Sequence, residues 1–379
     1  MRGSFRLGRI AGIEIGVNYT WLAAFAIISW SQAEYFFPQQ VPGYSPVIYW
    51  LLGMLSAILL FAAVLLHELA HSLYARSRGI PVNSIVFFIF GGVSNISQEA
   101  QRPRDEFLMA LFGPLTSLAI AAIAWGIWQF AGKTPGPLGA TLYYLAFINL
   151  LLAIFNLLPG YPLDGGRVLR AIIWGATGSI TRATNVAATV GQVFGWLLVG
   201  YGVFAIFSGN FLGGIWIAFI GWFLGGAATS SKQETTLKEH LKGVRVRDVM
   251  EANPETVSPR MLVADLVRDF FFQRGRRAVV VAEDGKALGI ITPTDVKGIP
   301  QEKWPGTQVA GIMTRSPLYS VAKDDELQSA FNLIAEHDLN QVLVLEDGRV
   351  AGLLSRADIM RYLHLSRELR FPARPSAPR

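Results

Sequence analysis

Two histidines and a glutamate stand at a spacing that suits metal-activated hydrolysis. His67 and His71 are four residues apart in the segment LLHELAHSLYARSRG, and Glu68 directly follows the first histidine. On a helix, residues at this spacing share one face, so both imidazoles can bind one metal ion. The Glu68 carboxylate can then accept a proton from metal-bound water. The alternative interpretation is a plain polar patch at a helix end.

A catalytic zinc ion usually has three protein ligands and one water, so a third ligand must come from elsewhere. Asp164 is a candidate, because it follows a hydrophobic run within NLLPGYPLDGGR, residues 156–167. The prolines and glycines of this segment exclude a regular helix, and irregular backbone at membrane depth occurs only against protein or a water-filled cavity. The segment therefore predicts a carboxylate ligand in a hydrated pocket, with a plain helix-end loop as the alternative.

The elements that must hold these residues are hydrophobic helices. Residues 1–228 carry 11 Lys/Arg and 7 Asp/Glu, whereas residues 229–379 carry 22 and 20. Charge-free runs in the first part reach the length of about 20 residues that crosses a bilayer. A large soluble core of buried helices is the alternative, but so many long uncharged runs disfavour it. The runs predict six transmembrane helices, at 18–37, 47–75, 107–130, 138–158, 185–207 and 211–228.

The loops between these helices predict their orientation. Segments 1–17, 76–106 and 159–184 contain ten Lys/Arg in total, whereas the loops of the opposite side contain only Lys133. By the positive-inside rule, the N-terminus, the C-terminus and the polar second half lie in the cytoplasm. We therefore expect a multi-pass protein of the cell membrane, in contact with the lipid bilayer.

The composition excludes several other classes of protein. The chain has 379 residues, of which 52% are hydrophobic and 16% are charged, and it contains no cysteine. Disulfides, cysteine-ligated zinc, iron–sulfur clusters and thiol catalysis are therefore excluded. The net charge of +6 is modest for this length, so no nucleic-acid partner is expected.

Taken together, HELAH and NLLPGYPLDGGR resemble the paired motifs of the site-2 protease family of intramembrane zinc metalloproteases, peptidase family M50. The resemblance covers the hydrophobic part of the chain. It implies one Zn²⁺ per chain, bound by His67, His71 and Asp164, with Glu68 as general base. Asn156 matches the family asparagine before the proline-rich turn, where it would orient the substrate carbonyl or stabilise the oxyanion. The implied activity is cleavage within or near the transmembrane segments of membrane-protein substrates, that is, regulated intramembrane proteolysis.

Two further segments carry the same resemblance. FFIFGGVSN at 87–95 is similar to the membrane-associated strand segment of the family, whose exposed edge could pair with an extended substrate. FGPLTS at 112–117 resembles a family motif that we interpret as helix packing. No loop between the predicted spans is long enough for the PDZ insertion that some members contain.

The last two predicted spans each contain a G-x-x-x-G pair. The pairs are Gly191 with Gly195 and Gly221 with Gly225. Close helix packing is the ordinary role of such pairs. A gate for the substrate is the alternative interpretation.

The polar half of the chain contains an internal repeat with an offset of 63 residues. Each copy predicts an amphipathic helix, at 261–274 and 326–337, followed by two short strands around an Asp-Gly turn. A repeat that occurs only twice at this length is not a common solenoid. The matched positions are Met250 with Met313, Asp284-Gly285 with Asp347-Gly348, Gly289 with Gly352, Thr292 with Ser355, and Asp295 with Asp358.

This repeat resembles a tandem pair of CBS domains, or Bateman module, on the segments RDVM, AGIM, GIITPTD and GLLSRAD. In nucleotide-binding members of that family, the hydroxyl contacts phosphate and the aspartate contacts the ribose. The resemblance thus implies an ATP, ADP or AMP site at Thr292, Asp295, Ser355 and Asp358. The alternative is that these residues are ordinary helix caps at strand–helix turns. CBS pairs also often associate, so a homodimer through this module is expected.

These observations predict a polytopic α-helical membrane domain of six transmembrane helices with a small membrane-associated β segment, followed by a soluble α/β tandem CBS module. The function that they predict is an intramembrane zinc metalloendopeptidase with a regulatory, nucleotide-sensing CBS pair. A CBS-regulated metal-ion transporter or channel is the alternative. The predicted divisions are 1–228, a linker 229–243, the CBS pair 244–365 (244–300 and 307–365), and a disordered tail 366–379.

Overall fold

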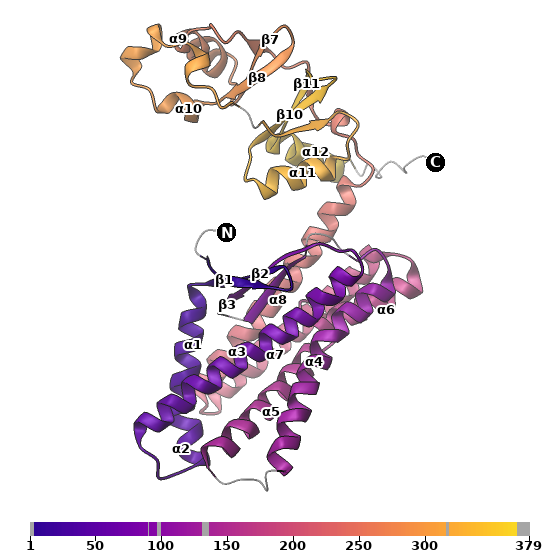
Figure 1. The fold of residues 1–379 in the computed structure, drawn as a ribbon. Helices are drawn as coiled ribbons and strands as arrows, with labels where there is room; N and C mark the ends of the chain where they lie inside the picture. The colour runs from indigo at the N-terminus through magenta and orange to yellow at the C-terminus, as the bar shows by residue number, and fades with distance from the viewer. Residues whose placement is uncertain (1–3, 90, 97–99, 131–135, 316–317, 370–379) are drawn as a thin grey trace. The chain divides into compact units, whose positions relative to one another are not determined.

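The computed structural model describes residues 4–89, 91–96, 100–130, 136–315 and 318–369. The chain divides into two units, Met1–Thr235 and Thr236–Arg379. The first unit consists mainly of long helices, and the second of short strands and helices (Figure 1).

Five helices among the described residues are long and apolar enough to cross a membrane, and each corresponds to one of the predicted spans. Only part of each apolar helix is buried within the protein, as expected for helices that also face lipid. They are α3 (Pro46–Ser77), α4 (Pro103–Phe130), α5 (Pro137–Asn156), α7 (Ile180–Phe207) and α8 (Phe211–Leu241). The last helix continues through most of the segment that was expected as a polar linker.

The predicted span at 18–37 is not a single α-helix. Its residues form α1 (Thr20–Ser31), a π-helical turn (Gln32–Phe36) and α2 (Phe37–Gln40). Pro38 has no backbone N–H to donate to the preceding turn, which fits a break in the regular hydrogen-bond pattern here. Within the described residues, five single helices are long and apolar enough to cross a membrane, so the predicted count of six spans is not confirmed.

A four-stranded sheet accompanies the helices of the first unit. Its order is β1-β2-β3-β4, with β2 parallel to β3 and the other pairs antiparallel. One face of the sheet buries Ile13, Ile85 and Phe87 against α3. The strands are β1 (Ser4–Ile10), β2 (Ile13–Asn18), β3 (Val82–Phe88) and β4 (Gly91–Ile96), so the segment predicted as a strand at 87–95 contributes to β3 and β4.

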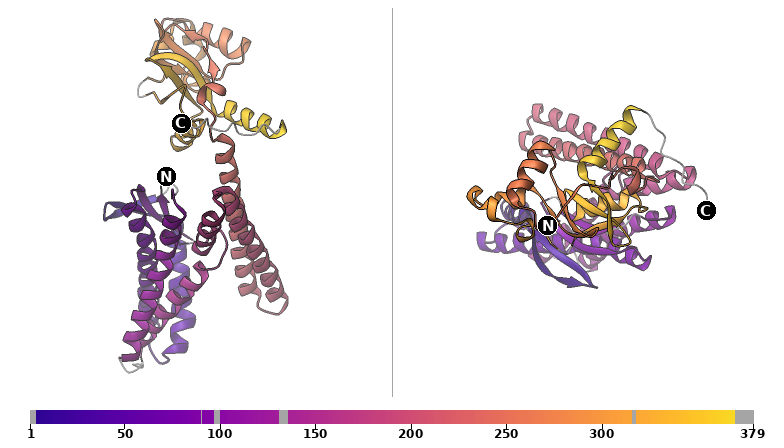
Figure 2. Two further views of the ribbon diagram at one scale, coloured as in Figure 1. Left: turned by 90° about the vertical axis from the view of Figure 1, so that its right-hand side faces the viewer. Right: turned by 90° about the horizontal axis from the view of Figure 1, so that it is seen from above.

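Helices α7 and α8 lie side by side, as the left view of Figure 2 shows. A Cβ atom on Gly195 would lie 2.7 Å from the Gly221 carbonyl oxygen, so close packing of these two glycines is confirmed. Gly191 packs instead against the backbone at Tyr161, and a Cβ atom on Gly225 would meet nothing within 4 Å. Gly195 therefore packs on the backbone of both Gly221 and Gly225, whereas Gly191 serves a different contact.

The second unit contains a seven-stranded sheet. Its main order is β6-β7-β8-β11-β10-β9, and β5 pairs with β11. Both predicted hairpins are confirmed, with positive φ angles at Asp284-Gly285 and Asp347-Gly348 as a tight turn requires. The strands are β5 (Glu251–Ala252), β6 (Thr256–Val257), β7 (Val279–Glu283), β8 (Lys286–Ile291), β9 (Ser320–Ala322), β10 (Gln341–Glu346) and β11 (Arg349–Ser355).

The amphipathic helices of the repeat are present but differ in form. The first is α9 (Val263–Leu266) continued by a π-helical turn (Val267–Gln273), and the second is α11 (Leu327–Glu336). Helix α10 (Pro293–Lys297) and helix α12 (Arg356–Glu368) follow the two hairpins. Short 3-10 turns occupy Val246–Asp248, Gln301–Gly306 and Val309–Gly311. Part of the predicted tail thus belongs to α12, and its residues 370–379 lie outside the described residues.

Residues near the start of each half of the repeat pack on the other half. The Met250 side chain of the first half packs on Gly352 of the second, and Met313 of the second half packs on Gly289 of the first. Residues 251–252 likewise form β5 on β11 of the second half. The matched methionines and glycines of the sequence repeat are therefore in contact, but between the halves.

Candidate metal centre

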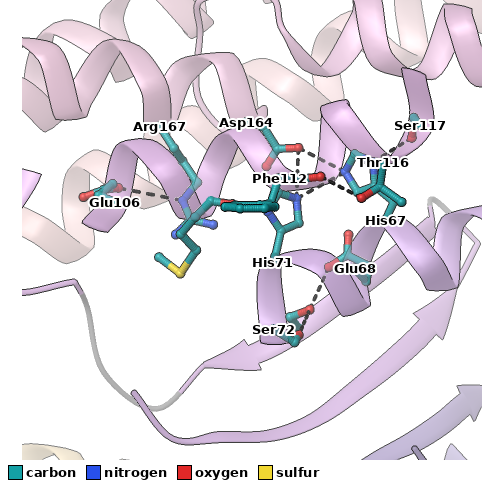
Figure 3. A network of polar contacts seen from close by, with 12 residues as sticks. His67, Glu68, His71, Ser72, Glu106, Phe112, Thr116, Ser117, Asp164 and Arg167 are labelled. Atoms are coloured by element: carbon teal, nitrogen blue, oxygen red, sulfur yellow. Dashed lines mark hydrogen bonds and ion pairs between the residues drawn. The ribbon is translucent and has the colours of Figure 1, made fainter. Parts of the chain in front are cut away.

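Three side chains that are distant in the sequence converge on one point of the first unit. His67 and His71 project from α3, and Asp164 is the first residue of helix α6 (Asp164–Thr177). The Asp164 Oδ2 atom lies 3.1 Å from His67 Nε2 and 3.2 Å from His71 Nε2, and the two Nε2 atoms are 3.2 Å apart. Figure 3 shows the three side chains pointing toward one another. Both histidines are buried and Asp164 is half-buried.

Helix α4 orients both imidazole rings through their other nitrogen atoms. His67 Nδ1 lies 2.9 Å from Ser117 Oγ, and His71 Nδ1 lies 2.6 Å from the Met109 carbonyl oxygen. Because a carbonyl oxygen only accepts, His71 Nδ1 donates to Met109, and Nε2 is left free as a ligand. The same orientation of His67 directs its Nε2 atom to Asp164 (Figure 3).

Gly113 lets α4 approach the histidines this closely. A Cβ atom at this position would lie 2.6 Å from His67 Nε2 and would overlap the His71 ring. The FGPLTS segment, interpreted from the sequence as packing, therefore supplies both a close approach at Gly113 and a hydrogen-bond partner at Ser117.

The arrangement of these donor atoms fits a zinc ion. Bonds of about 2.0–2.1 Å in tetrahedral geometry separate the ligand atoms by about 3.3 Å. The three separations here are 3.1, 3.2 and 3.2 Å. Two imidazole nitrogens and one carboxylate oxygen form a donor set that zinc accepts, and all three atoms lie within 4.8 Å of one another. Three protein ligands leave a fourth position for water or substrate.

A non-helical turn between α5 and α6 delivers Asp164. Residues 157–163 contain no regular helix, as predicted, but the prediction is wrong for Asn156, which ends α5, and for residues 164–167, which already belong to α6. The Tyr161 N–H donates to the Ala187 carbonyl of α7 at 3.2 Å, which fastens the turn. A Cβ atom on Gly166 would overlap the backbone at Gly160 and Tyr161, so only a glycine at position 166 permits this close packing.

Glu68 is half-buried beside the two histidines and is held by the sheet. The Ser94 hydroxyl of β4 donates to Glu68 Oε2 at 2.7 Å, and the Ser72 hydroxyl donates to Ser94 Oγ at 3.1 Å. A Cβ atom on Gly92 would lie 2.7 Å from Glu68 Cγ. Strand β4 therefore packs directly against the glutamate of the H-E-x-x-H motif.

Asn156 is less closely connected than the other candidates. It is the last residue of α5 and is half-buried. Among the described contacts, no hydrogen bond or ion pair joins it to the three converging side chains. Its link to the site is its place at the start of the turn that leads to Asp164.

The candidate nucleotide residues of the second unit bond to each other. Thr292 donates to Asp295 Oδ2 from its backbone N–H and from its hydroxyl, both at 2.7 Å. Ser355 makes the same two bonds to Asp358 Oδ2. Each pair is a reciprocal cap at the start of a helix, as the alternative interpretation predicted.

The sequence alone did not assign the residues that support the centre. Ser94 lies in the segment predicted as a strand, Ser117 lies in the segment interpreted as helix packing, and Met109 contributes only a backbone oxygen. Gly113 and Ser117 are one helical turn apart, so the sequence does indicate that both lie on one face of their helix and can contact the same neighbouring helix.

Two family models match this chain. The model of peptidase family M50 matches residues 55–135 and 132–198, and the CBS domain model matches 246–301 and 309–365. "Putative zinc metalloprotease Rip3" of Mycobacterium tuberculosis is 36% identical over 374 residues, covering 97% of this chain and 94% of that protein. "Putative zinc metalloprotease sll0528" of Synechocystis is 34% identical over 380 residues, covering 97% of each.

A solved structure, the site-2 protease from Methanocaldococcus jannaschii, is 28% identical and covers 60% of this chain and 95% of that chain, with a TM-score of 0.42. The relatives at 36% and 34% identity match nearly the whole chain, including both units. The chain therefore belongs to peptidase family M50, the site-2 protease family, as a multi-pass membrane zinc metalloprotease with a C-terminal CBS pair.

Proposed function

We propose that His67, His71 and Asp164 hold one zinc ion and that Glu68 is the general base for peptide hydrolysis. The convergence of three ligand atoms from two elements within 4.8 Å carries the proposal. When bound, zinc would polarise the substrate carbonyl and make a coordinated water more acidic. Glu68, held in place by Ser94, would accept a proton from the attacking water and give it to the leaving amine.

The substrate would bind in an extended form along β4. This strand is at one end of the sheet order, and its residues Gly92 and Ser94 contact Glu68. An extended peptide that adds to this edge would pass the proposed general base. A helical transmembrane substrate must first unwind, because its carbonyls are engaged in the helix, so we expect helix-breaking residues near the cut. Asn156 is proposed to orient the carbonyl from the start of the turn before Asp164.

The proposed membrane arrangement has six spans. The helical residues 20–40, although interrupted by the π-helical turn, are long enough to cross a bilayer of about 30 Å and would be the first span. The distribution of Lys/Arg supports a location in the cell membrane with both termini in the cytoplasm. The transporter alternative gains no support from the close relatives, which are named as metalloproteases.

The CBS pair is proposed to sense an adenine nucleotide and to mediate a homodimer. The matched Thr292–Asp295 and Ser355–Asp358 pairs support the nucleotide site by their equivalent positions after β8 and β11. The homodimer is proposed from the resemblance to CBS pairs, which often associate. The proposed domain limits remain 1–228 for the protease and 244–365 for the pair.

The decisive experiment compares the purified full-length protein with its Glu68→Gln variant, using a model transmembrane substrate. We expect about one zinc per chain in both proteins, with cleavage slowed by about 10²- to 10⁴-fold in the variant. Glu14→Gln is the matched control, because Glu14 pairs with Arg6 on β1 and takes no part in the site. Absence of zinc from the wild type, or full activity of Glu68→Gln, would reject the assignment.

The nucleotide proposal has a separate test. ATP, ADP and AMP are each added to the full-length protein, and the melting temperature of the CBS unit is followed. A ligand that binds the folded state and not the unfolded state raises this temperature, and the rise grows with the logarithm of the ligand concentration once that concentration exceeds Kd. An Asp295→Asn, Asp358→Asn variant should lose the shift. If none of the three nucleotides shifts the wild type, the proposal is abandoned.

A further inference from the structure

A buried ion pair joins α4 to α6 near the candidate metal centre. Glu106 lies in the first turn of α4 and is 0% exposed, and Arg170 of α6 is 6% exposed. Arg170 Nε donates to Glu106 Oε1 at 2.7 Å, and its NH2 group contacts the same oxygen. Arg167, one turn nearer to Asp164, places its Nε atom 3.8 Å from that oxygen (Figure 3).

Stability alone is a weak explanation for this pair. Desolvating two charges is costly, and replacing a buried pair by apolar residues is often neutral or stabilising. The second oxygen, Glu106 Oε2, is buried and has no hydrogen-bond partner among the described residues, which adds to this cost. A buried pair in such surroundings fits a role in fixing the position of α6 relative to α4.

The elements joined by the pair are those that carry and orient the metal ligands. Helix α4 orients both histidines of α3 through Met109 and Ser117. The same helix is joined to α6, which begins with Asp164, by the ion pair between Glu106 and Arg170. Arg170 also lies over the Tyr161 ring, 5.4 Å from its centroid, in the turn that precedes Asp164. Helix α4 is thus the common frame for all three converging side chains.

We propose that Glu106 is a positioning residue: through Arg170 and Arg167 it fixes α6 so that the Asp164 carboxylate meets the two histidine Nε2 atoms. The inference rests on the proposed zinc site. Arg170 is six residues, about 9 Å along the helix, from Asp164, so Glu106 acts through the helix and touches neither ligand nor substrate. Loss of the pair would let Asp164 withdraw while both histidines stay oriented by α4.

The test removes both charges together, in the full-length protein, as Glu106→Gln with Arg170→Met. This double variant avoids the unpaired buried charge that either single substitution would leave. We expect zinc affinity, measured by competition with a chelator, to fall by about 10- to 100-fold, as when a supporting partner of a ligand is lost. The visible absorption of the Co²⁺-substituted protein should also change, because it reports the number and geometry of the ligands.

The matched control is Asp105→Asn with Arg78→Gln. This neighbouring pair, with 3.2 Å between Arg78 Nε and Asp105 Oδ1, joins α4 to the residue that follows α3, is partly exposed and does not involve α6. Its removal should leave zinc affinity and the Co²⁺ spectrum unchanged. The melting temperature of the metal-free protein should differ little between the two double variants, which separates positioning from general destabilisation.

Wild-type zinc affinity and an unchanged Co²⁺ spectrum in the Glu106/Arg170 double variant would overturn the proposal. If that variant does not fold, Glu106→Asp decides, because it keeps the charge but withdraws the carboxylate from Arg170. Weaker zinc binding in Glu106→Asp supports positioning, and wild-type binding overturns it. Failure of the wild type itself to bind zinc would instead reject the proposed metal site, so the two failures are distinguishable.

Discussion

The two units contain candidate sites of opposite construction. In the first unit, His67 and Asp164 are 97 residues apart in the sequence, and their polar atoms meet at 3.1 Å. In the second, Thr292 and Asp295 are three residues apart and bond to each other at the start of a helix. The first arrangement stabilises no local secondary structure, whereas the second is a complete helix cap.

This difference shows how strongly each set of residues indicates function. Burying two imidazoles and a carboxylate together is costly unless a bound ion or a reaction uses them, so the convergence itself favours a metal site. A Thr or Ser with Asp three residues later is already explained by the stability of the helix start. The following predictions test whether this contrast holds.

Gly113→Ala should have the largest effect. Its methyl group would overlap the His71 ring and lie 2.6 Å from His67 Nε2, so the imidazoles must move. We expect zinc affinity to fall by about 100-fold or more, and cleavage with it. Gly126→Ala in the same helix is the control, because its Cβ atom would meet nothing within 4 Å. Equal zinc affinity in the two variants would contradict the close approach of α4.

Ser117→Ala should have the next largest effect. It removes the partner of His67 Nδ1 and leaves the ligand itself intact. Zinc affinity should weaken by about 10-fold, measured by chelator competition. Thr116→Ala is the control, since the Thr116 hydroxyl bonds only to the Phe112 carbonyl in the described contacts. A larger loss in Thr116→Ala than in Ser117→Ala would count against the orientation of His67 by α4.

Ser94→Ala tests the support of Glu68 by the sheet. It removes a hydrogen bond of 2.7 Å to the carboxylate, and the low end of the range for such a bond to a charged group, about 1.5 kcal/mol, corresponds to about 10-fold in rate. We expect cleavage to fall by about 10-fold while zinc content stays at the wild-type value. Loss of zinc together with activity would show that Ser94 supports the metal centre as a whole.

Thr292→Ala should have the smallest effect and sharpens the comparison from the other side. Loss of the cap should lower the free energy of unfolding of the CBS unit by about 1 kcal/mol, with zinc content unchanged. Thr294→Ala, an exposed neighbour, is the control. Unchanged stability in Thr292→Ala, with loss of a nucleotide-induced thermal shift, would instead show that the residue serves a ligand.

Much of the fold follows from patterns that are local in the sequence. The charge-free runs predict the long helices, because a span needs only length and hydrophobicity. The Asp-Gly pairs predict both hairpins of the second unit, because few residues adopt positive φ at low cost. The first predicted span fails as a single helix because composition does not register the π-helical turn at Gln32–Phe36.

The sequence by itself determined the helical spacing of His67 and His71, the irregular turn before Asp164 and the repeat of 63 residues. Tertiary structure alone decided that Met109 and Ser117 orient the histidines and that Glu106 pairs with Arg170 of α6. It also decided that Met250 and Met313 each pack on the other half of the repeat. The physical reason is distance along the chain. Periodicity fixes which residues share a face, but contacts between remote residues depend on how whole helices and strands pack.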